Sequence, residues 1–148
     1  MKIMVTGSRS WGACTEGIAR HQSHMGRRYC PMWRDAIQVM SLAVIENLGP
    51  LEDIDDVELV HGDCQGADHM AVALWSLHDL GPITAYPANW KALGRRAGPV
   101  RNGLMVSLMP WLVLAFHLNN SPGTADAIRQ ARAAGLEVVI YGKDGRLD

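Results

Sequence analysis

A chain of 148 residues, of which 48% are hydrophobic and 20% charged, is long enough to bury the core of one domain and too apolar for a disordered protein. Its formal net charge of -1 argues against a protein that binds nucleic acid through an overall basic surface, but it allows a small anionic ligand. We expect a cytoplasmic protein, because no stretch approaches the roughly 20 apolar residues of a membrane span, no signal peptide precedes the first strand pattern, and the three cysteines cannot all pair with one another.

The first half of the chain predicts two strands and two helices. Residues 2–6 form an apolar run that predicts the first strand, and apolar residues three or four apart predict a helix over residues 33–48. Residues 57–60 predict a second strand, and residues 68–80 a second helix. Residues 13–32 follow no period, so we expect an irregular insertion there.

The second half continues this alternation. Residues 83–86 predict a third strand, followed by a loop over residues 87–99. Further elements are predicted as a helix over 100–109, a strand over 111–116, a helix over 124–134, a strand over 137–141 and a polar tail over 142–148. Alternating strands and helices predict right-handed crossovers. We therefore expect one α/β domain over residues 1–148, with a Rossmann-like three-layer fold and a mostly parallel sheet of about five strands.

Glycine and polar residues gather in the loops that follow the predicted strands. In a parallel sheet these loops share one edge, where helix N-termini also point and where ligands bind. The first such loop is Gly7-Ser8-Arg9, in which glycine permits close approach, serine offers a hydroxyl and arginine suits phosphate. Because the tripeptide is short, it is also compatible with an ordinary turn.

The loop after the second strand carries the next group of candidates. These are His61, Gly62, Asp63, Gly66, Ala67 and Asp68. Two glycines before a helix suit a loop that surrounds an anion with backbone N–H groups. We expect Asp68 mainly to cap the helix, because aspartate is a preferred N-cap residue.

Further candidates lie in the second half of the chain. Ser121, Gly123 and Thr124 open a helix and suit a phosphate cradle, although serine and threonine are also common helix caps. Trp90 offers a face on which a base can stack, and Arg101 with Asn102 can bind a phosphate or a ribose. The adjacent Arg95 and Arg96 are expected to form a solvated face.

Residues 13–32 contain four residues of metal-ligating types. Cys14, His21, His24 and Cys30 are the ligand types of zinc sites. Their spacing matches no common closed zinc site, so we expect no metal and favour an insertion that lies over the ligand site.

The order of these motifs resembles the YspA-related branch of the SLOG superfamily, which includes the DNA-processing protein DprA and the LOG phosphoribohydrolases. The resemblance rests on a series of short motifs. They are Gly7-Ser8-Arg9, His61-Gly62 with Gly66-Ala67-Asp68, Ala88 with Trp90-Lys91, Ala97-Gly98-Pro99 with Arg101-Asn102, Ala115-Phe116, and Ser121-Pro122-Gly123-Thr124. It implies a Rossmann-like fold with a nucleotide-type ligand over the strand ends.

The chain departs from this pattern at two places. LOG-type enzymes carry a catalytic glutamate after their glycine-rich motif, whereas this chain has Ala125 and the shorter Asp126. Relatives also tend to have an aspartate before the fourth strand, where this chain has Pro110-Trp111. The first departure weakens a catalytic role more than a binding role.

These observations leave three functions open. The first is a sensor, carrier or sequestering protein for a nucleotide or an ADP-ribose-like ligand, and the resemblance adds phages and bacterial conflict systems as a setting. The second is a nucleotide N-glycosidase of the phosphoribohydrolase type, with Asp68 or Asp126 as the catalytic candidate. The third, single-stranded DNA binding of the DprA kind, conflicts with the near-neutral charge. We expect no cofactor. Trp75, Trp111 and Met105 suit either the core or the interface of a homo-oligomer.

Overall fold

The centre of the protein is a six-stranded, mostly parallel sheet with the strand order β3-β2-β1-β4-β5-β6. The computed structural model describes residues 1–23 and 25–147. Its strands are β1 (Lys2–Gly7), β2 (Glu58–His61), β3 (Ile83–Ala85), β4 (Leu112–Phe116), β5 (Val138–Gly142) and β6 (Gly145–Arg146). Neighbouring strands pair in parallel, except that β6 pairs antiparallel with β5.

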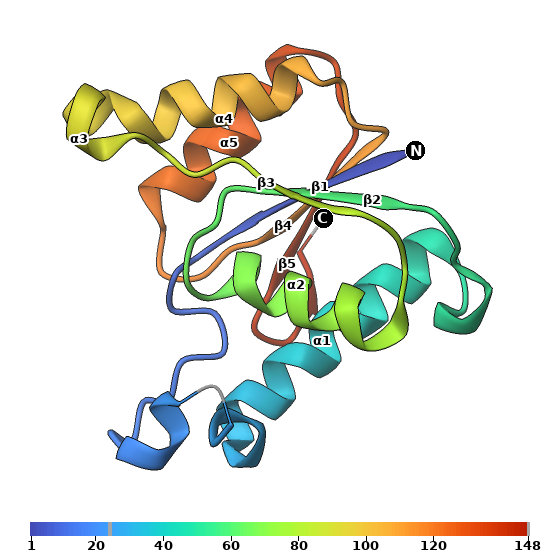
Figure 1. Cartoon of the computed structure of the whole chain (residues 1–148), viewed down its shortest axis with the longest axis vertical. Coiled ribbons are helices and arrows are strands. Elements are labelled where there is room, and N and C mark those ends of the chain that lie inside the picture. Colours follow the sequence, from blue (N-terminus) through green and yellow to red (C-terminus); the bar gives the residue numbers. More distant parts are fainter. Residues whose placement is uncertain (24, 148) are drawn as a thin grey trace.

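Helices cover both faces of this sheet. The α-helices are α1 (Pro31–Leu48), α2 (Ala67–His78), α3 (Trp90–Leu93), α4 (Ala97–Ser107) and α5 (Pro122–Ala133). Short 3-10 helices are η1 (Ala19–Gln22), η2 (Arg27–Tyr29), η3 (Leu51–Asp53) and η4 (Gly94–Arg96). Figure 1 shows α1 and α2 on one face and α3, α4 and α5 on the other. The prediction of a Rossmann-like three-layer α/β fold is confirmed. None of the helices in the described residues is long and apolar enough to span a bilayer.

The alternation of side chains along the strands separates two cores. Ile3 and Val5 of β1 belong to the core under α1 and α2, whereas Met4 belongs to the core under α4 and α5. Successive side chains of a strand point to opposite faces, so an apolar run is buried on both sides. The run in β4 is completely buried for this reason, as its sequence predicts.

Two segments differ from the sequence-based prediction. The predicted loop over 87–99 contains α3 and η4, and α4 begins within it at Ala97. Asn89 starts α3 by accepting a hydrogen bond from the backbone N–H of Ala92 at 3.1 Å, and four residues are too few to show a helical period. The predicted tail also contains β6, which returns against β5 through a short turn.

The strand order creates a crevice between β1 and β4. After β1 the chain passes to α1 on one face of the sheet, whereas after β4 it passes to α5 on the other face. Such a reversal leaves an opening at the carboxyl ends of the two strands, where ligands of doubly wound sheets bind. The fold therefore places the loops after β1 and β4 side by side.

Two of the three residues considered for an oligomer interface belong to the core. Trp75 is 1% exposed and donates a hydrogen bond from Nε1 to the carbonyl of Val57 at 2.8 Å. Met105 is also 1% exposed. Trp111 is 56% exposed, so of these three residues it alone remains available to a partner.

Candidate functional site

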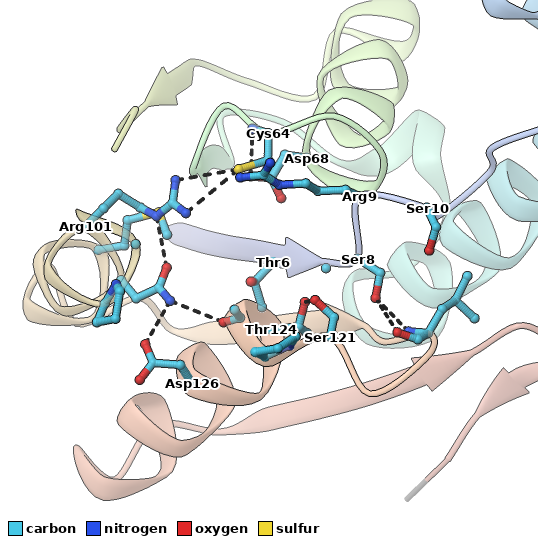
Figure 2. Close-up of a pocket in the computed structure, with 18 of the residues that line it drawn as sticks. Thr6, Ser8, Arg9, Ser10, Cys64, Asp68, Arg101, Ser121, Thr124 and Asp126 are labelled. Carbon is cyan, nitrogen blue, oxygen red and sulfur yellow. Dashed lines mark hydrogen bonds between the residues drawn. The ribbon is translucent and has the colours of Figure 1, made fainter. Parts of the chain in front are cut away.

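A pocket of about 610 Å³ opens at the carboxyl ends of β1 and β4. Figure 2 shows side chains from both sides of the sheet edge converging on it. The predicted residues that line it are Gly7, Ser8, Arg9, Asp68, Trp90, Arg101, Asn102, Ser121, Gly123, Thr124 and Asp126. Segments far apart in the sequence thus meet at one edge, as the positions of their loops predict.

Several residues of the loop after β2 do not line the pocket. These are His61, Gly62, Asp63, Gly66 and Ala67, all of which the sequence analysis expected at the ligand. Asp63 is exposed and its carboxylate lies 3.0 Å from Nε2 of His69. The buried His61 accepts a hydrogen bond at Nδ1 from the backbone N–H of Asp63, and burial lowers its pKa. The polar groups of His61 and Asp63 therefore bond to neighbouring residues of the chain and not to the pocket.

Asp68 holds that loop in place. Its Oδ2 accepts hydrogen bonds from the backbone N–H groups of Gly62, at 2.9 Å, and Cys64, at 3.3 Å. The N-cap of α2 is Gly66 rather than Asp68, so the expected capping role is replaced by a bond from the first turn of the helix back to the loop. Burial raises the pKa of Asp68 to about 6, although these N–H groups and the nearby Arg101 oppose the shift.

The glycines of the first two loops serve close packing. A Cβ at Gly66 would lie 2.3 Å from the carbonyl oxygen of Ser8, and the backbone there has a φ of +82°. A Cβ at Gly7 would lie 2.4 Å from Cβ of Ala67. These residues let the start of α2 contact the end of β1, so their role is structural.

Arg101 joins α4 to the loop after β2. Its Nη1 donates to the carbonyl of Gly62, and its Nε donates to Oδ1 of Asn102 at 2.9 Å. A Cβ at Gly62 would lie 2.3 Å from Arg101 Nη1, so glycine makes room for the guanidinium. Nη2 contacts Sγ of Cys64 at 3.8 Å, a weak interaction that an anion in the pocket can replace.

The hydroxyl of Ser8 joins the loop after β1 to the loop after β4. It donates to the carbonyl of Leu118 at 2.9 Å and accepts from the backbone N–H of Leu118 at 2.7 Å. Ser8 is 2% exposed, so these bonds are shielded from water. Ser8 lines the pocket, but its hydroxyl is already bonded to the backbone of Leu118. It therefore holds the two loops together and is not available to a ligand.

The first turn of α5 is open to the pocket. Ser121 is its N-cap residue but forms no capping hydrogen bond through its side chain, since its hydroxyl accepts from Thr124 Oγ1 at 3.2 Å. A Cβ built on Gly123 meets nothing within 4 Å. The first turn contains no acidic residue. Its N–H groups and positive dipole end therefore face space that an anion can enter.

Asp126 and Asn102 connect α5 to α4. Oδ2 of Asp126 accepts hydrogen bonds from Nδ2 of Asn102, at 3.0 Å, and from Gln130, at 2.8 Å. Its Oδ1 accepts from Arg129 at 3.0 Å. The buried Asn102 also donates to the carbonyl of Gly123. Both carboxylate oxygens of Asp126 are engaged, which weakens its case as a catalytic residue.

Arg9 and Trp90 form an outer wall of the pocket. The guanidinium carbon of Arg9 lies 5.9 Å from the ring centroid of Trp90, a distance at which a cation and an aromatic face attract each other. Trp90 is 48% exposed. Arg95 and Arg96 are both exposed, as expected of a solvated face, and Arg95 also lines this pocket.

The sequence analysis missed other lining residues. They are Thr6, Ser10, Cys64, Arg95, Gly98, Pro99, Met105, Leu118, Asn119 and Pro122. Four of these ten, Thr6, Ser10, Cys64 and Pro122, are direct neighbours of predicted residues. Gly98 has a more specific role, because a Cβ there would lie 3.2 Å from the Trp90 ring. No motif in the sequence reveals that contact.

The insertion does not cover the pocket. Among the described residues, none of residues 13–32 lines it, and Figure 1 shows η1 and η2 beside the N-terminal end of α1. The expected position of the insertion is therefore wrong. The structure brings Cys14, His21 and Cys30 together, whereas His24 lies outside the described residues.

Comparison with known proteins finds a relative in a phage. The chain is 36% identical over 88 residues to the Gene 61 protein of Mycobacterium phage D29, and this match covers 57% of the chain and 70% of the phage protein. No family model matches the chain. No solved structure matches it either.

Proposed function

We propose that this chain, which belongs to the same family as the Gene 61 protein of Mycobacterium phage D29, binds a nucleotide or a nucleotide-derived, ADP-ribose-like ligand in the pocket between β1 and β4. It would act as a sensor, carrier or sequestering protein. The observation that carries the proposal is the open first turn of α5, which faces the pocket without an acidic residue or a side-chain cap.

The charges around the pocket favour an anion. Arg9, Arg95 and Arg101 line it, together with two carboxylic acids. Hydrogen-bond donors of the protein engage both acids: Asn102 and Arg129 donate to Asp126, and the backbone N–H groups of Gly62 and Cys64 donate to Asp68. Arginine binds phosphate with two parallel hydrogen bonds. A phosphate group at the α5 turn is the anion that fits this arrangement.

The size and walls of the pocket favour a ligand larger than inorganic phosphate. A volume of about 610 Å³ falls within the range of roughly 300–1,000 Å³ that is usual for small-molecule sites. Trp90, which is 48% exposed, adds an aromatic face to the pocket wall. The resemblance to SLOG proteins supports the same ligand class.

A comparison of adenosine, AMP and ADP-ribose tests the proposal. Thermal shift and isothermal titration should show binding of at least one phosphate-bearing compound and at least tenfold weaker binding of adenosine. Arg95→Gln should weaken binding, whereas Arg34→Gln should not, because Arg34 lies exposed on α1 outside the pocket. Equal binding of adenosine and AMP, or equal effects of the two substitutions, would contradict it.

Asp68 supports a second candidate function, cleavage of an N-glycosidic bond in a nucleotide. A carboxyl group with a pKa of about 6 that lines a pocket can act as a general acid near neutral pH. Incubation with nucleoside monophosphates and chromatography of the products should reveal a free base if this function holds. Release that persists in Asp68→Asn would rule out Asp68 as the acid.

A further inference from the structure

Residues 13–30 form a segment with almost no core of its own. Two short 3-10 helices, η1 and η2, are its regular elements in the part of the chain that the structure describes. Its buried residues there are His21, which is 7% exposed, and Cys30, which is 1% exposed. The segment packs on α1 partly through Arg27, whose guanidinium lies 5.6 Å from the ring centroid of Trp33. Segments that cannot bury an apolar core are commonly held by disulfides or metals.

The buried residues meet a third side chain of the same class. One ligand atom from each of Cys14, His21 and Cys30 lies within 4.8 Å of the other two. Sγ of Cys14 lies 3.5 Å from Nδ1 of His21. The residues come from three different parts of the segment: the stretch before η1, η1 itself and the residue before α1. The chain therefore folds back on itself to bring them together.

Other roles do not account for these three residues. Cys30 is the N-cap residue of α1, yet its side chain forms no capping hydrogen bond. Both cysteines are free thiols, so no disulfide closes the segment.

We infer that Cys14, His21 and Cys30 bind a zinc ion that fixes residues 13–30 against the start of α1. Two thiolates and one imidazole are ligands that zinc prefers, and atoms 4.8 Å or less apart need only small shifts to reach bond lengths of about 2.0–2.3 Å around one ion. Each thiol that still carries a proton releases it when the Zn–S bond forms. The sequence spacing of these three residues is unlike that of common zinc sites. Spacing is a weak guide here, because the path of the chain between the ligands decides whether they meet.

Metal titration of the intact chain tests the inference. Protein treated with a chelator under reducing conditions should bind one Zn²⁺ or Co²⁺ per chain. With water as the fourth ligand, Co²⁺ should give thiolate charge-transfer absorption together with the visible bands of tetrahedral coordination. Cys14→Ser, His21→Ala and Cys30→Ser should each weaken Zn²⁺ binding by about 100-fold or more, since even residues that only support metal ligands contribute about 10–100-fold. Cys64→Ser and His78→Ala are the matched controls and should bind metal as the unaltered chain does.

Two further measurements keep the inference testable if a variant folds poorly. His21→Cys should retain Zn²⁺ binding and increase the charge-transfer absorption, because three thiolates replace two. In the unaltered chain, Zn²⁺ should slow trypsin cleavage at Arg20, Arg27 and Arg28, and a chelator should restore it. Absence of stoichiometric metal binding, or equal losses in Cys64→Ser and Cys14→Ser, would overturn the inference.

Discussion

Two glycine-bearing turns lie at the same edge of the sheet and differ in how they use their backbone. In the β2–α2 loop, residues 62–66, Asp68 accepts from the N–H groups of Gly62 and Cys64. Gly62 packs against Arg101, and Gly66 packs against the backbone of Ser8. The β4–α5 connection, residues 119–123, includes the first two residues of α5. This helix has no side-chain cap, and Gly123 faces open space. One turn is a packed structural element, and the other is a candidate binding element.

This difference shows that glycine at the start of a helix has two separate uses. At Gly66 the absence of a Cβ allows two backbone segments to touch, and the positive φ is accessible at low cost. At Gly123 the absence of a Cβ is not required by any protein atom nearby. Substitutions at the two positions can therefore separate stability from ligand binding.

The largest expected effect is the loss of stability in Gly66→Ala. The new Cβ would lie 2.3 Å from the Ser8 carbonyl oxygen on a backbone with a φ of +82°. We expect the free energy of unfolding to fall by about 3 kcal/mol or more, as measured by urea denaturation. Gly123→Ala is the matched control and should leave stability unchanged or raise it by up to about 1 kcal/mol. Equal stability of the two variants would contradict the assignment of a structural role to Gly66.

The second prediction concerns the pH dependence of stability through Asp68. Its pKa is about 6 in the folded protein and has an ordinary value of 3.8. Between these values the folded chain binds more protons than the unfolded chain, so the contribution of Asp68 to stability is present below pH 3.8 and is lost as the pH rises through 6.

Comparison with Asp68→Asn isolates this contribution. Relative to the variant, the unaltered chain should lose about 3 kcal/mol of unfolding free energy between pH 3.8 and pH 7. Urea denaturation at a series of pH values measures the difference, and groups that titrate in both proteins cancel. A constant difference across this pH range would show that burial does not raise the pKa of Asp68.

The third prediction tests how the crevice between β1 and β4 is held. Ser8→Ala removes the acceptor of the Leu118 N–H and one of the two donors to the Leu118 carbonyl, the other being the N–H of Ser121. We expect a loss of about 2 kcal/mol in unfolding free energy. Ser10→Ala is a suitable control, because Ser10 is exposed, and should change stability by less than about 0.5 kcal/mol. Equal losses of stability in Ser8→Ala and Ser10→Ala would show that Ser8 does not hold the crevice together.

The fold was more predictable than the roles of the site residues. Hydrophobic runs and the alternation of strands with helices depend on local sequence, so the sheet and its four longer helices followed from them. Element α3 escaped prediction because four residues hold no period, and β6 escaped because two residues hold none. The position of the loops at one edge followed from the topology, which explains why most predicted residues line the pocket.

The roles depend on contacts between distant segments. The hydroxyl of Ser8 donates to the carbonyl of Leu118, and the guanidinium of Arg101 donates to the carbonyl of Gly62. The partners are far apart in the sequence, and no sequence motif links them. The sequence therefore identified these residues as polar groups at the site without showing that their partners belong to the protein. The proximity of Cys14, His21 and Cys30 depends in the same way on how the chain folds between them, so their spacing in the sequence did not predict it.

The smallest expected effect bears directly on the proposed ligand. Gly123→Ala places a methyl group at the open first turn of α5, where the proposal puts a phosphate. We expect the affinity for the best-binding nucleotide to fall about tenfold, which corresponds to about 1.4 kcal/mol. Isothermal titration measures this change, and weak binding of adenosine should stay the same because adenosine has no phosphate. An unchanged nucleotide affinity in a stable variant would place the anion away from α5 and leave the arginines alone to bind it.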